Sequence, residues 1–241
     1  MSDPFAHHPG LKPLIQDPMT SRFRDFDIWE LAKEIPDLDA EKFLIPTDDR
    51  EAFRLAFLED KRADDLWVFA YGSLCWDPGF IFEDVRRGFA PDYERKFILR
   101  DIFGGRGNAE RPGLMAALDQ GTGCDGLVYR IPQAILEAET KILWGRERAG
   151  AAYHETMIKV EIDGAAIKAL AFVADHDSEA ICAELTQDQQ VTYLATGTGF
   201  LGSSLEYADS LAQNLGVLGI VDPSLDMILE RARGWVSREE G

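Results

Sequence analysis

Six short apolar segments between Leu66 and Ala174 constrain the fold of this 241-residue chain more than any other feature. Each segment is rich in aromatic, β-branched or other apolar residues and has the length of a single strand. In the fifth segment, residues 158–162 alternate between apolar and polar side chains, which is typical of a strand with one buried face. The predicted strands cover residues 66–71, 97–102, 113–118, 126–131, 154–162 and 167–174.

Helices are predicted mainly after these strands. One helix is expected between the fourth and fifth strands, with Pro132 in its first turn and an apolar face that includes Leu136 and Leu143. Strands followed by a run of helices favour an α+β fold over a regular alternation of strand and helix. The three later helices are predicted over 178–196, capped by Ser178, over 204–216, ending at Gly216, and over 222–236, capped by Asp222.

The first 65 residues are predicted to form an N-terminal extension, with residues 66–241 as the main domain. Residues 1–24 are rich in proline and polar side chains, so we expect them to be mobile or draped over the surface. Two short helices are expected next, and the charged stretch 60–65 reads as a linker. The second of these helices is predicted to be capped by Asp48 or Asp49 and to bury Phe53, Ala56 and Phe57.

Charge argues against two classes of partner. The chain has 25 basic and 43 acidic residues and a formal net charge of −18. Nucleic acids and anionic membrane surfaces are bound through clustered Lys and Arg, so we expect neither as a partner. No apolar stretch reaches the roughly 18 residues of a membrane span, and the N-terminus lacks the pattern of a secretory signal.

Cysteine and histidine spacing gives a second set of expectations. Cys75, Cys124 and Cys182 are far apart and form no CxxC pair, which is typical of free thiols in a reducing compartment. We therefore expect a cytoplasmic protein. The four histidines have no metal-binding spacing, so we expect neither a metal nor another cofactor.

Residues 197–202 read Gly-Thr-Gly-Phe-Leu-Gly and match the GxGxxG pattern of dinucleotide-binding proteins. That fingerprint requires a strand before the first glycine, but the residues before Gly197 have a helical pattern. Only 19 residues remain after Asp222, too few to complete a nucleotide-binding half. A sharp connection between two helices is the favoured interpretation, and dinucleotide binding is kept as an alternative.

Three local features contain residues suited to substrate binding or catalysis. The first is Tyr71-Gly72-Ser73-Leu74 at the end of the first strand, where a turn can aim several backbone amides at one point. Taken alone, this string is more simply explained as an ordinary turn at the end of a strand. The second is the glycine-rich segment 104–113, in which Arg106 and Arg111 can pair with a carboxylate or simply face water.

The third feature is Glu147, at the C-terminal end of the inserted helix. The negative end of a helix dipole disfavours a carboxylate anion there, and partial burial would raise its pKa towards the range of a general base or acid. Alternatively, Arg146 and Arg148 neutralise Glu147 at the surface. Tyr153 follows shortly and opens the next predicted strand.

Together these pieces resemble the ChaC-type γ-glutamylcyclotransferases, in a form similar to the bacterial branch. The resemblance covers about residues 66–236 and depends on the combination of segments. The stretch 149–152 departs from it, because relatives often have a single small-residue turn before the tyrosine. The matching segments are YGSLCWDPGF (71–80), RRGFAPDY (86–93), RGNAERPGLMAALDQGTGCDGLVYRI (106–131), LWGRERAGAAY (143–153) and LEYADSLAQNL (205–215).

The resemblance implies a small, distorted mixed β-barrel surrounded by helices. It implies a lyase that cleaves glutathione, a small-molecule γ-glutamyl peptide, into 5-oxoproline and cysteinylglycine without a cofactor. It places the catalytic carboxylate at Glu147. It places substrate-binding residues at Tyr71, Gly72, Ser73, Leu74 and Tyr207, with Tyr153 as a further candidate. A role for Arg106 as carboxylate partner is our own inference.

Chemistry supports one carboxylate as the central group. The α-amine of a γ-glutamyl amide can close on its own γ-carbonyl, so positioning removes much of the barrier. A single carboxylate can take the proton of the amine and give it to the leaving nitrogen. Three alternatives stay open: another γ-glutamyl amine or amino acid as substrate, a binding protein that has lost the chemistry, and the dinucleotide-binding protein.

Overall fold

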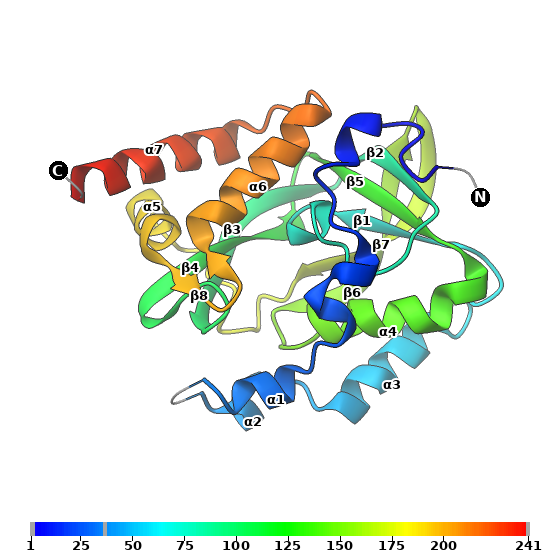
Figure 1. The fold of residues 1–241 in the computed structure, drawn as a ribbon, viewed down its shortest axis with the longest axis horizontal. Coiled ribbons are helices and arrows are strands. Elements are labelled where there is room, and N and C mark those ends of the chain that lie inside the picture. Colours follow the sequence, from blue (N-terminus) through cyan, green and yellow to red (C-terminus); the bar gives the residue numbers. More distant parts are fainter. Residues whose placement is uncertain (1–2, 36–37, 240–241) are drawn as a thin grey trace.

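The computed structural model describes residues 3–35 and 38–239, which form a mixed β-barrel with helices around it (Figure 1). Among these residues no helix is long and apolar enough to cross a membrane. The strands are β1 (Leu66–Ala70), β2 (Asp84–Ala90), β3 (Tyr93–Phe103), β4 (Asn108–Gln120), β5 (Cys124–Ile131), β6 (Tyr153–Ile162), β7 (Ala165–Ala174), β8 (Thr198–Gly199) and β9 (Gly202–Ser203). The α-helices are α1 (Ile28–Ala32), α2 (Ala40–Phe43), α3 (Thr47–Leu58), α4 (Leu136–Glu147), α5 (Gln187–Thr196), α6 (Ser204–Val217) and α7 (Pro223–Glu239). Short 3₁₀ turns cover Pro9–Leu11, Pro18–Thr20, Arg22–Arg24, Ser73–Cys75 and Gln133–Ile135.

Five strands close the barrel in the order β1-β5-β2-β6-β7, and β7 returns to β1. The β1–β7 pair is parallel, with Val68 opposite Leu170, whereas β1–β5, β5–β2, β2–β6 and β6–β7 are antiparallel. The β3–β4 hairpin extends the sheet beyond β7, where Leu118 lies opposite Val173. The predicted α+β class with a distorted mixed barrel is therefore confirmed.

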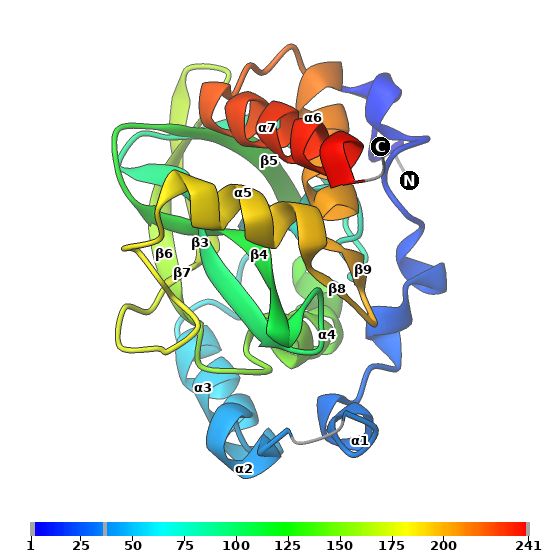
Figure 2. The same cartoon turned by 90° about the vertical axis from the view of Figure 1, so that its left-hand side faces the viewer.

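Helices cover the sheet from two sides. Helices α5, α6 and α7 pack together beside β4, and α1 to α4 gather at the opposite end (Figure 2). The six predicted strands are all present. Strand β2 was not predicted, and its inward positions include Gly88, a residue with low strand preference.

Three helix predictions need correction. Residues 178–186 are not helical; α5 begins at Gln187 because Thr186 and Gln189 form a reciprocal capping box. The chain before it instead pairs with β3, where the amide of Arg100 donates to the carbonyl of Ala180. Pro132 lies ahead of a 3₁₀ turn, and α4 begins only at Leu136.

The third correction concerns α3, which is capped by Pro46 rather than by an aspartate. Its buried side chains are Arg54 and Leu58, while Phe53 is 41% exposed. Arg54 is stabilised by ion pairs with Glu51 at 2.7 Å and Glu137 at 3.0 Å, which is why a charged residue can face inward here.

Helix α7 begins as predicted, since the Asp222 carboxylate accepts a hydrogen bond from the amide of Leu225.

The N-terminal segment is draped along the outside of the barrel, from α6 to α4 (Figure 1). It is anchored by Leu11 and Ile15, which are 0% and 6% exposed and belong to the main apolar cluster. The boundary at residue 65 stays a prediction.

The segment 197–202 is a tight hairpin of β8 and β9 between α5 and α6. A helix, not a strand, precedes Gly197, so the local geometry is that of the predicted helix-to-helix connection. The backbone of Gly199 lies against the 104–107 loop, where an added Cβ would lie 2.1 Å from the carbonyl oxygen of Gly104. Close backbone packing therefore explains a glycine at this position.

Candidate active site

A small cavity of about 40 Å³ lies where the chain leaves β1 and α4 ends. Every residue predicted for the site lines it except Arg106. Met115 and Ala116 of β4 complete the walls. The lining residues are Tyr71, Gly72, Ser73, Leu74, Met115, Ala116, Glu147, Tyr153 and Tyr207.

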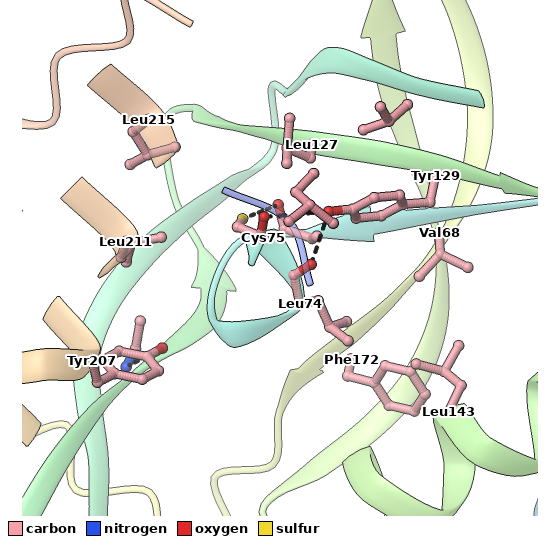
Figure 3. Packing of buried hydrophobic residues seen from close by; sticks show 14 of the residues in the cluster. Val68, Leu74, Cys75, Leu127, Tyr129, Leu143, Phe172, Tyr207, Leu211 and Leu215 are labelled. Atoms are coloured by element: carbon pink, nitrogen blue, oxygen red, sulfur yellow. Dashed lines mark hydrogen bonds between the residues drawn. The ribbon is translucent and has the colours of Figure 1, made fainter. Parts of the chain in front are cut away.

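The Tyr71–Leu74 loop is held from outside the cavity. The Tyr71 carbonyl accepts a hydrogen bond from Nε of buried Arg95 at 2.7 Å, and its hydroxyl donates to the carbonyl of Phe172 at 2.7 Å. The Tyr129 hydroxyl donates to the carbonyl of Leu74 at 2.9 Å and approaches that of Cys75 at 3.3 Å (Figure 3). The loop therefore has its carbonyls fixed by the protein core.

The amides of the same loop remain available. Within residues 3–35 and 38–239, the amides of Gly72, Ser73 and Leu74 donate to no protein acceptor. They lie at the start of the Ser73–Cys75 turn, where backbone amides lack internal partners. Free amides at a cavity wall can bind a carboxylate or a developing oxyanion.

Gly72 is required by the approach of Tyr207. A Cβ at this position would lie 2.7 Å from the Tyr207 hydroxyl oxygen. That hydroxyl accepts a hydrogen bond from the amide of Ala116 at 3.2 Å, and the Tyr153 hydroxyl donates to the carbonyl of Ala116 at 3.3 Å. One residue of β4 thus positions both tyrosine hydroxyls.

Glu147 is the last residue of α4, and its side chain is 12% exposed. Its Oε1 accepts a hydrogen bond from Nε of Arg146 at 2.7 Å. Burial raises the pKa of the Glu147 carboxyl, and the neighbouring Arg146 only partly opposes this. The carboxylate therefore has the raised proton affinity that a general base and acid needs.

Arg146 connects this carboxylate to the loop. Its guanidinium donates to Ser73 Oγ at 2.7 Å and to the carbonyl of Asp77, and it stacks on the Phe23 ring at 4.1 Å. The expectation that an arginine neutralises Glu147 is therefore correct for Arg146, but the expected surface position is wrong. Arg146 pairs with Glu147, but in a buried position.

Arg148, the second arginine expected to neutralise Glu147, has a different partner. Arg148 pairs with Glu155 at 3.0 Å and donates to the carbonyl of Tyr153. It thereby joins the end of α4 to β6. The stretch 149–152 between them leaves Tyr153 in the cavity wall.

Burial also raises the pKa values of the three tyrosines in the cavity wall. It raises the pKa of Tyr207 to about 12 and the pKa values of Tyr71 and Tyr153 well above their usual value. All three phenols are therefore neutral hydrogen-bonding groups at physiological pH, which leaves Glu147 as the group suited to move a proton.

Arg106 lies behind the cavity rather than in its wall. The side chain donates to the carbonyl of Ser203 at 2.8 Å and its guanidinium covers the Tyr207 ring at 5.1 Å. This geometry suits support of Tyr207. Direct pairing of Arg106 with a substrate carboxylate stays a prediction.

Sequence reasoning missed the roles of Arg95 and Arg146 in holding the loop. Arg95 carries no local signal, because its partners come from distant parts of the chain. The match of Arg146 to Ser73 depends on how α4 packs against the end of β1. In the described part of the chain, no group of three or more His, Cys, Asp or Glu side chains is placed to hold a metal ion.

Comparison with known proteins gives consistent matches. The family model described as ChaC-like protein matches residues 66–236. The glutathione-specific gamma-glutamylcyclotransferase of Escherichia coli K12 is 33% identical over 192 residues, covering 78% of this chain and 83% of that protein. The human glutathione-specific gamma-glutamylcyclotransferase 1 is 31% identical over 159 residues, covering 64% and 71%.

The fold is similar to a solved structure as well. The crystal structure of a yeast γ-glutamyl cyclotransferase specific to glutathione aligns with a TM-score of 0.66. The alignment covers 71% of this chain and 97% of the yeast chain at 20% identity, which supports the fold.

Proposed function

This chain belongs to the ChaC-like protein family, and on that premise we propose that it cleaves glutathione to 5-oxoproline and cysteinylglycine by intramolecular cyclotransfer. The observation that carries the proposal is the buried carboxylate of Glu147 in one small cavity with the free amides of the 72–74 loop. The relatives from Escherichia coli and human are named for the same activity. The substrate is therefore a small γ-glutamyl peptide.

Glu147 is the proposed base and then acid. The α-amine of the substrate is largely protonated near neutral pH and must lose that proton to solvent before it can attack. Attack forms a bond between the α-nitrogen and the γ-carbon, and the amine then gives up a second proton to Glu147. The bond from the γ-carbon to the cysteine nitrogen breaks as Glu147 returns the proton to that nitrogen.

The loop amides are proposed to bind the oxygen of the γ-carbonyl. Negative charge develops on this oxygen as the amine attacks, and preoriented amides stabilise it without reorganising. Tyr153 and Tyr207, fixed by Ala116, border the same space and hold the γ-glutamyl chain in a bent conformation. Holding the amine next to the carbonyl lowers the activation barrier and accounts for much of the rate.

A panel of γ-glutamyl substrates tests the activity. Glutathione should give equal amounts of 5-oxoproline and cysteinylglycine, measured by chromatography with mass detection. γ-Glutamyl amines and γ-glutamyl amino acids belong in the same panel, because exclusive turnover of one of them would replace glutathione as the substrate. If no member of the panel yields 5-oxoproline, the proposal is wrong.

Ser73→Ala is expected to lower kcat about threefold to tenfold without abolishing turnover. The substitution keeps the loop amides and removes only the oxygen that accepts from Arg146 at 2.7 Å. The net contribution of a typical hydrogen bond, about 0.5–1.5 kcal/mol, corresponds to a change in rate of this size. Steady-state release of 5-oxoproline measures the effect. Complete loss of turnover would instead indicate that the serine is a nucleophile and that an acyl-enzyme forms.

Arg146→Met is expected to shift the acidic limb of the kcat/KM profile to higher pH. Only the deprotonated carboxylate of Glu147 is a base, so kcat/KM falls as pH drops through its pKa. Burial raises that pKa and Arg146 lowers it, so loss of the cation should raise it further.

Arg146→Lys is the matched control, since it keeps a positive charge beside Glu147. Its acidic limb should stay close to that of the wild type. An unchanged limb in Arg146→Met would exclude Glu147 as the titrating base.

A further inference from the structure

A second, larger cavity of about 370 Å³ lies between the N-terminal extension and the β3–β4 hairpin. Its lining is mostly apolar, and its charged residues are Lys42, Arg100, Asp101, Asp177 and Glu179. The extension contributes one wall through Ile28, Leu38 and Phe43, and the hairpin contributes Leu99, Phe103 and Met115.

This cavity adjoins the active site. Met115 lines both cavities. The stretch 149–152, which begins two residues after Glu147, lines the larger cavity, and Tyr153 lines the smaller one. Met115 therefore forms part of the wall of both spaces.

The N-terminal extension is joined to the stretch 149–152 by backbone pairing. Leu44 forms an isolated bridge with Gly150, and the amide of Ile45 donates to the carbonyl of Ala149 at 3.0 Å. The unusual stretch 149–152 thus has a role, because it is where the extension attaches beside the catalytic carboxylate.

One cation in the cavity wall lacks an acidic partner. Within the described ranges, Arg100 forms no ion pair, although the chain is strongly acidic overall. Its Nε is buried without a hydrogen-bond partner, and only a weak contact of 3.5 Å joins its guanidinium to the carbonyl of Glu179. Lys42 at the same cavity is already paired with Glu179 at 3.2 Å.

An apolar space with one free guanidinium suits a ligand that has both an apolar group and a carboxylate. The leaving half of glutathione has the carboxylate, on its glycine, but its cysteine side chain is too small to fill about 370 Å³. A peptide whose cysteine sulfur carries an alkyl or aryl substituent has both properties.

We propose that this cavity binds the leaving half of S-substituted glutathione, so that the enzyme cleaves glutathione S-conjugates as well as glutathione. The inference rests on the proposed function and adds a substrate class to it. The apolar substituent packs against Leu38, Phe43 and Phe103, and Arg100 pairs with the glycine carboxylate. The bonds formed and broken are unchanged, and the leaving amine is that of the S-substituted cysteinylglycine.

S-Hexylglutathione and glutathione are the probes. The wild type should cleave both at similar kcat, with a KM for S-hexylglutathione about tenfold lower, because the hexyl chain leaves water for the apolar wall. Leu38→Asp places a charge in that wall and should raise the KM for S-hexylglutathione about tenfold while leaving glutathione turnover unchanged. Leu38→Met is the matched control and should retain the preference.

Arg100 is tested with peptides that lack the carboxylate. Arg100→Gln should raise the KM for S-hexylglutathione about tenfold and leave the KM for its C-terminal amide unchanged. An equal response of acid and amide would overturn the assignment of the leaving half to this cavity.

Glutathione turnover by the wild type distinguishes failure of the proposed function from failure of the cavity assignment. If glutathione gives no 5-oxoproline, the proposed function fails. If glutathione is cleaved but S-hexylglutathione has an equal or higher KM, or if Leu38→Asp affects both peptides alike, only the cavity assignment is overturned.

Discussion

Glu147→Gln is expected to fold normally and to release 5-oxoproline from glutathione about 10³-fold more slowly than the wild type, since general acid–base catalysis contributes about 10²–10⁴-fold. Glutamine has nearly the same shape, and its carbonyl oxygen can still accept the hydrogen bond from Arg146 Nε. It cannot take a proton from the α-amine. The substrate can still bind in its bent conformation, but no carboxylate is present to pass a proton to the leaving nitrogen.

Steady-state kcat for 5-oxoproline and the thermal midpoint Tm measure the two halves of this prediction. Glu155→Gln is the matched control, because Glu155 is also a partly buried carboxylate paired with an arginine, but it does not line the cavity. The control should retain most of the turnover. If Glu147→Gln retains near-wild-type kcat, Glu147 has no part in the proton transfer.

Arg95→Met is expected to lower the free energy of unfolding by about 3–5 kcal/mol, the usual cost of removing one partner of a buried ion pair. Arg95 is 5% exposed and pairs with Asp222 at the start of α7. Its other donors bind the carbonyls of Tyr71 at 2.7 Å and Asp125 at 2.6 Å. Methionine fills the space but leaves a carboxylate and two carbonyls without their donor.

Urea denaturation of the variant and wild type measures this difference. Arg87→Met is the control, since Arg87 pairs with Asp125 across a much more exposed surface, where such pairs contribute about 0–1 kcal/mol. Equal destabilisation by the two substitutions would show that Arg95 does not hold the loop to α7. Turnover of Arg95→Met should also fall, because the Tyr71 carbonyl loses the hydrogen bond that fixes the loop.

Local pattern predicted the strands well and the helix ends less well. Apolar runs such as 66–71 and 126–131 are confirmed because burial on both faces leaves little freedom in assigning them. The start of the helix at 178 was wrong because two candidate caps compete, and only pairing of residues 180–182 with β3 decides between them. For α3 the prediction was wrong at Phe53 and Ala56, which are exposed, whereas Phe57 is partly buried against the core. The buried residue Arg54 was missed because its burial depends on Glu137, a residue of α4.

The sequence by itself determined the α+β class, the run of strands, the family resemblance and the candidates Glu147 and Tyr71 to Leu74, because these depend on local pattern and short motifs. Tertiary structure alone decided that Arg146 joins Glu147 to Ser73, that Arg106 lies behind Tyr207, and that the extension closes a second cavity beside Met115. These contacts join residues far apart in the chain. Their energies arise only when barrel closure brings the partners together, so no local pattern records them.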